Sequence, residues 1–457
     1  MPTNSCDAGL IRQTKSTCVV CQKEIDARIV EQERAIFMLK DCPEHGPEKV
    51  VLSYHPAYYK IMNHLYFNVY NREIPYKKFF LYFTNKCNLT CPICYLDCPH
   101  KKTDEMSLPD IEEALKRMGK IRCILHGAEP TAREDLLEII QLMNKYQGSV
   151  DMFTNGIKLA DKAYVQALKD AKVGMIYLQF DGFDREAYKT LRGRDLLDEK
   201  MRALENLNAL GMPIVLIGVI GKGVNDGEIE KIIKFAASQD NVKAVTFIGL
   251  SIIGGAGASL EKYATTIDEC VNKLELLSQG RLSRNYLRFC QKINYIFADL
   301  LNMRVCYFFQ QYILFKNKGN YTTLNDILDT QKMEQILDTH AEMTKKGSPF
   351  STLRFVVAMI FQQATNLKSI KYFLNLSKIV FFGFCGIRYE EKSGSPLIVT
   401  FHDGCDRYKL DLGVVSRCDR IMVYKENGVI HYDKSIGNYF MDKEVERLDR
   451  IKNGCAC

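Results

Sequence analysis

The chain has 457 residues, of which 47% are hydrophobic and 26% charged, and its formal net charge is +7. These proportions are those of an ordinary globular protein and exclude a disordered chain. The sequence contains no run of lysine and arginine that would indicate a nucleic-acid partner. Its small excess of positive charge permits peripheral contact with an anionic membrane surface.

Targeting signals are absent from the sequence pattern. The N-terminus begins without an apolar signal core, and the longest apolar runs, at 355–361 and 379–384, fall far short of the roughly 20 residues that span a bilayer. We therefore expect a cytoplasmic protein without a transmembrane segment. Because cytoplasmic thiols are kept reduced, the 17 cysteines are not expected to form disulfides. Many of them occur in groups, which metal ligation explains better than core packing.

Residues 1–75 predict a small N-terminal metal-binding module. Cys18 and Cys21 form a Cys-x-x-Cys pair, and Cys42 and His45 follow about twenty residues later, beyond a hairpin-like segment. This spacing is typical of a tetrahedral site, which zinc or a rubredoxin-like iron would fit. The fourth ligand stays open, because Cys6 or a cysteine from elsewhere could replace His45. A hairpin without metal is the alternative.

Residues 76–253 alternate regularly between apolar strands and amphipathic helices. The expected strands lie at 79–83, 123–126, 149–153, 175–180, 213–219 and 244–250, and the expected helices at 108–118, 133–146, 162–171, 197–210 and 226–238. Such alternation predicts parallel strands joined by right-handed crossovers. The strands are almost wholly apolar, which fits a sheet covered on both faces. The predicted fold class is therefore α/β, a partial (β/α)6 barrel of the TIM type.

Residues 254–457 are less regular and predict an α+β region. Helical patterns occur at 265–277 and 332–345, and a strand is expected at 396–401. Asn427 and Gly428 stand between two short apolar segments, which is a hairpin signal. We expect this region to contribute to substrate binding or to hold an auxiliary cluster.

Three cysteines directly follow the first expected strand of the α/β region. Cys87, Cys91 and Cys94 have three and then two residues between them. Thiolates at this spacing can ligate three of the four irons of a cubane, which leaves the fourth iron open for catalysis. Folds of this kind place their active sites at the carboxyl ends of parallel strands. A structural zinc knuckle is the alternative, and the position after the first strand favours the 4Fe–4S cluster.

These residues resemble the radical S-adenosylmethionine (radical SAM) superfamily. Its cysteine loop has an aromatic residue before the third cysteine, where this chain has Ile93. After the second strand, Gly127, Ala128, Glu129 and Pro130 resemble the family's Gly-Gly-Glu-Pro motif, with alanine replacing the second glycine. The resemblance implies that Glu129 offers its carboxylate to the ammonium group of the substrate S-adenosylmethionine (SAM).

Polar residues also end the later strands. Thr154 and Asn155 end the third strand, Asp181 ends the fourth, and Asn225 follows the fifth. Each alone is an ordinary turn signal, but all are expected at one edge of the sheet together with the cysteines. By the resemblance they would line the ribose, adenine and carboxylate pockets of SAM.

The N-terminal module and the segment 191–196 with Lys200 resemble one group within that superfamily. The group includes archaeal tetraether-lipid synthases and pterin methyltransferases, and the likeness covers about residues 15–250. Because that group binds extra iron–sulfur clusters through C-terminal cysteines, an auxiliary cluster is left open here. The candidate ligands are Cys290, Cys385, Cys405, Cys418, Cys455 and Cys457, with buried or tail thiols as the alternative. Cys98, just past the cysteine loop, has no assigned role.

The resemblance implies an enzyme that cleaves SAM reductively to a 5′-deoxyadenosyl radical, which abstracts hydrogen from an unactivated carbon. A lipid is the leading candidate for the source of that carbon. A radical SAM methyltransferase or a peptide-modifying enzyme is the second hypothesis, so a pterin and a peptide also stay open as substrates. An electron donor such as a ferredoxin or flavodoxin is expected. The remote alternative is a non-catalytic metal-binding protein, which would have no affinity for SAM.

Overall fold

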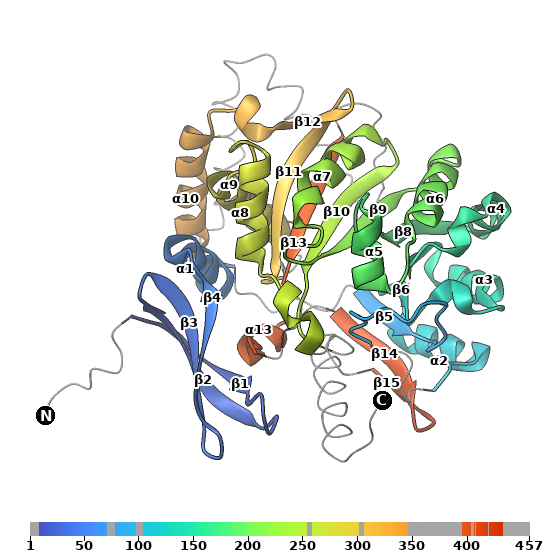
Figure 1. The fold of residues 1–457 in the computed structure, drawn as a ribbon, viewed down its shortest axis with the longest axis horizontal. Helices are drawn as coiled ribbons and strands as arrows, with labels where there is room; N and C mark the ends of the chain where they lie inside the picture. The colour runs from blue at the N-terminus through green and yellow to red at the C-terminus, as the bar shows by residue number, and fades with distance from the viewer. Residues whose placement is uncertain are drawn as a thin grey trace, which may run out of the picture.

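The computed structural model describes residues 9–70, 78–96, 104–253, 258–300, 306–345, 354, 358, 395–403, 406, 408–418 and 420–432. Within these residues the chain forms a four-stranded sheet near the N-terminus and an eleven-stranded sheet that makes up the body of the molecule (Figure 1).

The N-terminal sheet is an antiparallel meander whose strands pair in chain order. Its strands are β1 (Leu10–Thr17), β2 (Glu24–Gln32), β3 (Ala35–Cys42) and β4 (Gly46–Ser53). Glu33 and Arg34, between β2 and β3, both have positive φ, as a tight hairpin turn of two residues requires. Ile29, Ile36 and Met38 form its small core. The sequence predicted one hairpin-like stretch here, and the structure extends it to four strands.

The large sheet is parallel through its centre. Its six central strands are β5 (Lys78–Tyr82), β6 (Arg122–His126), β7 (Val150–Thr154), β8 (Val173–Gln179), β9 (Ile214–Ile220) and β10 (Val242–Gly249). They lie side by side in chain order, each parallel to the next. The predicted α/β core is thereby confirmed, and in the described residues the sheet stays open rather than closing into a barrel.

Helices connect these strands and cover the sheet. They are α2 (Leu108–Met118), α3 (Leu136–Gln147), α4 (Lys162–Asp170), α5 (Arg185–Arg192), α6 (Leu197–Ala209) and α7 (Ile229–Ser238). Ser107 and Asp110 form a capping box that begins α2, because each side chain accepts from the other's backbone N–H. Five of the six helices were predicted to within a few residues. The sequence analysis missed α5.

Strands from the C-terminal region extend the same sheet at both edges. These strands are β11 (Phe309–Asn317), β12 (Asn320–Thr323), β13 (Pro396–His402), β14 (Arg420–Glu426) and β15 (Val429–His431). β13 pairs parallel to β10, and β14 pairs parallel to β5 and forms the predicted hairpin with β15. The division into regions 1–75, 76–253 and 254–457 stays a prediction, but strands of the third region complete the sheet of the second.

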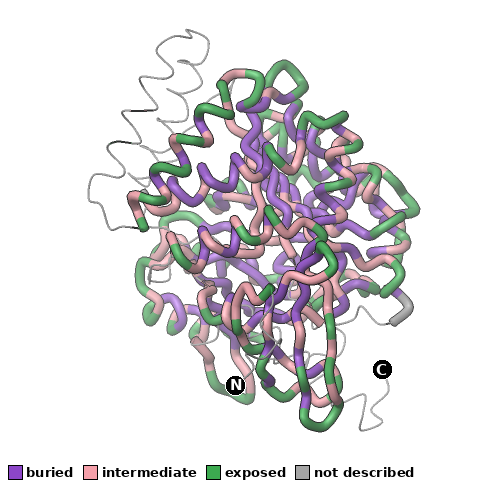
Figure 2. Tube along the Cα trace, turned by 90° about the vertical axis from the view of Figure 1, so that its left-hand side faces the viewer, coloured by how far each residue is buried: buried purple, intermediate pink, exposed green. Residues whose placement is uncertain are grey.

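The remaining helices pack against these sheets or, like α10 and η2, against one another. They are α1 (Pro56–His64), the π-helical turn η2 (Leu65–Val69), α8 (Ile267–Leu277), α9 (Arg284–Leu300), α10 (Thr330–Lys345) and α13 (Leu412–Val415). The predicted helices at 265–277 and 332–345 correspond to α8 and α10. Figure 2 shows buried residues concentrated inside the body and exposed ones at its loop tips and outer helix faces. No helix of the described residues is both long and apolar enough to cross a membrane.

Buried polar contacts fix the N-terminal sheet to the body. Arg12 of β1 forms an ion pair with Asp411, which also accepts a hydrogen bond of 2.6 Å from Thr14. The Ser53 hydroxyl at the end of β4 donates to Asp268 of α8 at 2.6 Å. The small sheet therefore has a defined position beside α13 and α8 (Figure 1).

Candidate functional site

Four ligand groups converge at one end of the N-terminal sheet. The ligand atoms of Cys18, Cys21, Cys42 and His45 all lie within 4.8 Å of one another. The sulfur atoms of Cys21 and Cys42 are 3.8 Å apart, and His45 Nδ1 is 3.5 Å from the Cys42 sulfur. A tetrahedral ion with bonds of about 2.3 Å to sulfur and about 2.0 Å to nitrogen requires ligand separations of about 3.5–3.8 Å. The four residues thus fit a single tetrahedral metal, with His45 as the fourth ligand.

The electrostatics of this group also favour a metal. Burial opposes ionisation of Cys18, but hydrogen bonds from the backbone of Cys21 and Val20 outweigh it and lower the pKa of the Cys18 thiol to about 7. A metal binds the thiolate rather than the thiol, so a lowered pKa reduces the cost of binding near neutral pH.

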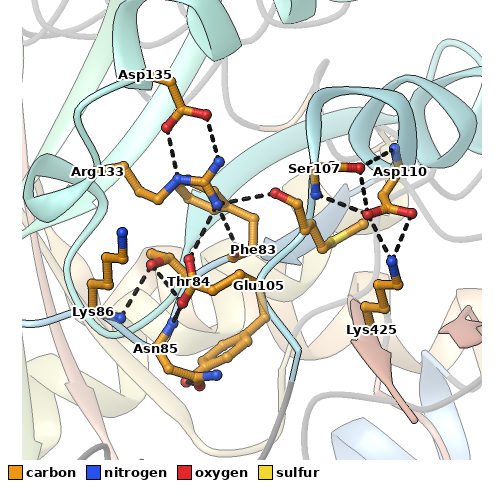
Figure 3. A network of polar contacts seen from close by, with 12 residues as sticks. Phe83, Thr84, Asn85, Lys86, Glu105, Ser107, Asp110, Arg133, Asp135 and Lys425 are labelled. Atoms are coloured by element: carbon orange, nitrogen blue, oxygen red, sulfur yellow. Dashed lines mark hydrogen bonds and ion pairs between the residues drawn. The ribbon is translucent and has the colours of Figure 1, made fainter. Parts of the chain in front are cut away.

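The cysteine loop after β5 is held firmly at its root (Figure 3). Arg133 donates to the Phe83 carbonyl oxygen at 3.3 Å and to the Glu105 carboxylate at 3.1 Å, and it pairs with Asp135 at 2.6 Å. Glu105 in turn accepts from the backbone N–H of Asn85 at 2.6 Å. The chain therefore leaves the strand in one direction, toward Cys87.

Cys87, Cys91 and Cys94 are half-buried on this loop, and a backbone hydrogen bond of 3.1 Å from Cys94 to Cys91 turns the chain between them. Among the described residues, the close group of metal ligands is the N-terminal one, and these three cysteines do not form such a group. A 4Fe–4S cluster takes one thiolate per iron, so it does not require three sulfur atoms around a single ion. Burial raises the pKa of Cys87 to about 12, and the nearby negative charge of Glu129 adds to this. Bound iron would reverse that shift, because a metal deprotonates the thiols that coordinate it.

Glu129 lies 1% exposed at the carboxyl end of β6. Its Oε1 accepts three hydrogen bonds, from the Thr131 backbone and hydroxyl and from the Thr154 hydroxyl, whereas Oε2 accepts one, from the Asn155 backbone at 2.6 Å. A carboxylate has about four acceptor positions shared between two oxygens, so Oε2 keeps capacity for another donor. The structure brings the predicted Glu129, Thr154 and Asn155 together, and their contact with SAM stays a prediction.

The strand exit before Glu129 depends on one glycine. Gly127 has φ +152°, and a Cβ there would lie 2.9 Å from the Thr84 carbonyl oxygen. The next residue, Ala128, has no such constraint and donates its backbone N–H to the same oxygen at 3.0 Å. Alanine therefore fits the second position of the motif, while the first position requires glycine.

Asp181 is completely buried at the end of β8. Its carboxylate binds the Arg192 guanidinium at 2.7 and 2.9 Å and accepts from the Val219 backbone at 3.0 Å and from Gln179 at 2.5 Å. Burial raises the pKa of the Cys91 thiol, and the nearby positive charge of Arg192 opposes that rise. The role of Asp181 in this geometry is to hold Arg192 beside the cysteine loop.

Lys200 of α6 connects the ends of β7 and β8. It is completely buried and donates to the Asn155 carbonyl oxygen and to the Gln179 side-chain oxygen. Burial lowers its pKa to about 7, although Asp181 opposes the shift. One polar network, the rim network, therefore runs through Glu129, Asn155, Lys200, Gln179, Asp181 and Arg192, and the charge of Arg192 acts on Cys91. The sequence analysis gave Arg192 and Lys200 only within a resembling segment and assigned them no role.

Asn225 is buried where β8 and β9 end. Its amide donates to the carbonyl oxygens of Asp181 and Val219, both at 2.8 Å, and its oxygen accepts from the Gly221 backbone at 2.9 Å. Both amide hydrogens are therefore used to fix the backbone of two strand ends. A contact between Asn225 and SAM stays a prediction.

An aromatic face lies beside the cysteine loop. It comprises Phe80, Tyr82, Tyr95, His126, Phe153 and Tyr177. Phe153 and Tyr177 stack with centroids 4.6 Å apart, and the Tyr95 hydroxyl lies 2.9 Å from His126 Nε2. Cys94 packs against this group. The sequence analysis did not find this face, because its rings come from four different strands and one loop.

The C-terminal cysteines are only partly described. Cys290 is buried in the core, where its sulfur accepts from the Ile313 backbone at 3.4 Å, and Cys418 is half-buried near the Arg420 carbonyl oxygen. The other four candidates, Cys385, Cys405, Cys455 and Cys457, lie outside the described residues, as do Cys6 and Cys98. The auxiliary cluster therefore stays a prediction.

Comparison with protein families matches both parts of this geometry. Residues 81–236, which include the cysteine loop and the rim network, match the radical SAM superfamily. Residues 10–54, which contain the convergent metal group, match the HMPTM N-terminal zinc ribbon domain. The radical SAM match implies a 4Fe–4S cluster and SAM as cofactors, and the ribbon match implies a metal in the N-terminal module.

Relatives share these parts over limited lengths. A 7,8-dihydro-6-hydroxymethylpterin dimethyltransferase from Methanocaldococcus jannaschii is 32% identical over 304 residues, which is 60% of either chain. A probable GTP 3′,8-cyclase from Pyrococcus abyssi is 33% identical over 156 residues, which is 34% of this chain and 50% of that protein. Among solved structures, Streptococcus suis SuiB bound to its precursor peptide SuiA is 19% identical and covers 46% of this chain and 47% of that one, with a TM-score of 0.39.

Proposed function

We propose that this chain, which carries a radical SAM domain behind an N-terminal zinc ribbon, is an enzyme. It would abstract hydrogen from an unactivated carbon of its substrate. The observation that supports this proposal is the rim network, which runs from the buried carboxylate of Glu129 to Arg192, a cation whose charge acts on the Cys91 thiol. The bound cluster, once reduced, would supply the electron that cleaves SAM to a 5′-deoxyadenosyl radical.

Different residues of this chain would bind the cluster and SAM. Cys87, Cys91 and Cys94 would hold the cluster and leave one iron for SAM. The free capacity of Glu129 Oε2 suits the SAM ammonium group, because a buried carboxylate binds a cation strongly. Arg192, held by Asp181, presents positive charge to the Cys91 sulfur and so stabilises the negative charge of a thiolate-bound cluster.

The aromatic face would exclude water from the reaction. A primary carbon radical reacts with whatever hydrogen source reaches it, so the site must be closed to side reactions. Phe153 and Tyr177 are half-buried, stack on each other and pack against the same apolar cluster as Cys94, and an apolar substrate segment would fit against them. This surface supports a substrate with an apolar or flat carbon skeleton, and a lipid is the leading class.

A second candidate is methylation of a nitrogen heterocycle. It is supported by the M. jannaschii relative, whose name gives a pterin as the acceptor. The match of residues 10–54 to the HMPTM N-terminal zinc ribbon domain also supports it. Flat rings would also stack well on the aromatic face. A peptide substrate remains a further alternative.

The test is release of 5′-deoxyadenosine by anaerobically reconstituted protein given SAM and dithionite. We expect release from the native chain and none above background from Cys87→Ala. Equal release from the two proteins would overturn the proposal. SAM labelled in its methyl group then separates the two candidates, since label in the product requires methyl transfer.

The proposal also includes a cytoplasmic location and a protein electron donor. Both follow from the chemistry, because reduced thiolates persist in a reducing compartment and each SAM cleaved requires one low-potential electron.

A further inference from the structure

A shallow depression opens on the surface beyond the carboxyl end of β7. It is lined by Ile157, Lys158, Ala160, Asp161, Tyr164 and Arg202. These residues come from the turn after β7 and from α4 and α6, which lie next to each other at the edge of the body (Figure 1). None of them belongs to the rim network described above.

Two hydrogen bonds connect this depression to the cysteine loop. The Ile157 backbone donates to the Asn155 side-chain oxygen at 3.0 Å, and the Asn155 amide donates to Asn88 at 2.7 Å. Asn88 follows Cys87 directly and is exposed. The depression is therefore the outer surface beside the loop that would hold the cluster.

The charge of this surface is positive. Lys158, Lys162 and Arg202 are exposed, and none of them forms an ion pair with a carboxylate among the described residues. Lys158 lies 5.6 Å from the centre of the Tyr164 ring, so a cation and an aromatic face are presented together. Asp161, the one acidic lining residue, accepts from the Ala163 backbone at 2.9 Å as the cap of α4.

Two other acidic groups on α6 pair with arginines outside the depression, although Glu199 also lies near the charge of Arg202. Asp198 and Glu199 pair with Arg185 and Arg194, at 2.6 and 2.8 Å. Glu205, about one turn beyond Arg202, is the exposed carboxylate that remains on that helix. The depression and its border therefore carry three cations against two anions, one of which is engaged as a helix cap.

We propose that this depression is the docking site of a small acidic one-electron carrier protein of the ferredoxin or flavodoxin type. The inference rests on the proposed function, because only a cluster that must be reduced requires such a partner. Opposite charges steer transient electron-transfer partners together, and such interfaces are small. The electron transfer balances, because a flavodoxin hydroquinone would be oxidised to the semiquinone while the cluster is reduced by one electron.

The experiment compares two reductants acting on the same reconstituted full-length protein. The variant is Lys158→Glu with Arg202→Glu. The control is Lys120→Glu, an exposed residue just before β6 and so at the amino ends of the parallel strands, whereas the depression lies beyond the carboxyl end of β7. Formation of 5′-deoxyadenosine is measured with reduced flavodoxin of strongly negative net charge and, separately, with dithionite.

We expect the double variant to lower the second-order rate with flavodoxin at least about tenfold at low ionic strength, and added salt to shrink the difference. The dithionite rate and the KM for SAM should not change, and Lys120→Glu should match the native chain. Titration of oxidised flavodoxin into the reconstituted protein should show weaker binding to the double variant, a result that does not depend on turnover.

Equal flavodoxin rates and affinities for the native chain and the double variant would overturn the docking site. An equal fall with dithionite would also overturn it, because the surface would then act on SAM or on folding. No product from the native chain with dithionite would instead overturn the proposed function, and this inference with it.

Discussion

The two cysteine-rich parts of the molecule differ in how their candidate metal ligands are arranged. In the N-terminal ribbon, three sulfur atoms and one imidazole nitrogen already lie within 4.8 Å of one another. On the loop after β5, Cys87, Cys91 and Cys94 form no such close group, and the ordered contacts lie around them, at the root of the loop and at Arg192. The geometry of the ribbon fits one metal ion, whereas the rim of the large sheet would hold a 4Fe–4S cluster and SAM.

The contrast shows where each site obtains its stability. The ribbon has a small core of a few apolar side chains, so we expect its metal to contribute much of the folding free energy. The rim is fixed by buried charges on strands and helices of a large apolar core, so it can exist before the cluster binds. The predictions below test this difference.

The largest effect is expected at the ribbon. Replacement of Cys42 by Ser should release the metal, whose binding contributes about 10–16 kcal/mol in isolated zinc-finger peptides, more than a small sheet otherwise has. Hydrogen exchange should then accelerate throughout residues 10–54 while α2 and α3 stay protected. Unchanged protection of β1–β4 in metal-free protein would show that the ribbon folds without its ion.

The next effect is expected at the rim. Asp181→Ala leaves the Arg192 guanidinium, whose side chain is only 11% exposed, without its counter-charge. Such losses cost about 3–5 kcal/mol of unfolding free energy, measurable by urea denaturation. The double variant Asp181→Ala with Arg192→Met should recover most of this, since no buried charge remains. If the single and double variants are equally unstable, the ion pair is not what holds the rim.

Lys200 gives the stability of the rim a pH dependence of its own. Its pKa is lowered by burial to about 7, whereas an unfolded lysine titrates near 10.4. Between these values the unfolded state binds more protons, so this residue makes stability rise with pH from about 7 to about 10. The rise should be smaller in Lys200→Met. Parallel curves for the two proteins would mean that Lys200 is charged in the folded state throughout this range.

The smallest effect is expected at the surface of the ribbon. Lys15 and Glu24 form an ion pair of 2.5 Å in which both side chains are more than half exposed. Solvent and salt screen such pairs, so Lys15→Ala should leave the thermal unfolding of the ribbon unchanged. A clear loss of stability would show that surface charge, and not the metal, holds the ribbon together.

Short-range patterns predicted most of the fold and both groups of cysteines. The ribbon ligands lie on two neighbouring turns, and the six central strands are apolar runs bounded by turns, so local spacing was enough to find them. The rim network was not predictable, because Arg192 meets Asp181 only when α5 folds back across the end of β8. β11 was missed because its place depends on pairing with β13, which lies about eighty residues later.

The central claim is that the chain holds two independent metal sites, one structural and one that binds SAM. Electron paramagnetic resonance of the reduced protein, with and without SAM, tests it most directly when combined with metal analysis of Cys91→Ala and Cys42→Ser. We predict that Cys91→Ala abolishes the SAM-dependent change of the cluster signal and keeps the ribbon metal, while Cys42→Ser loses that metal and keeps the change. A SAM response that survives in Cys91→Ala, or that disappears with the ribbon metal, would contradict the account.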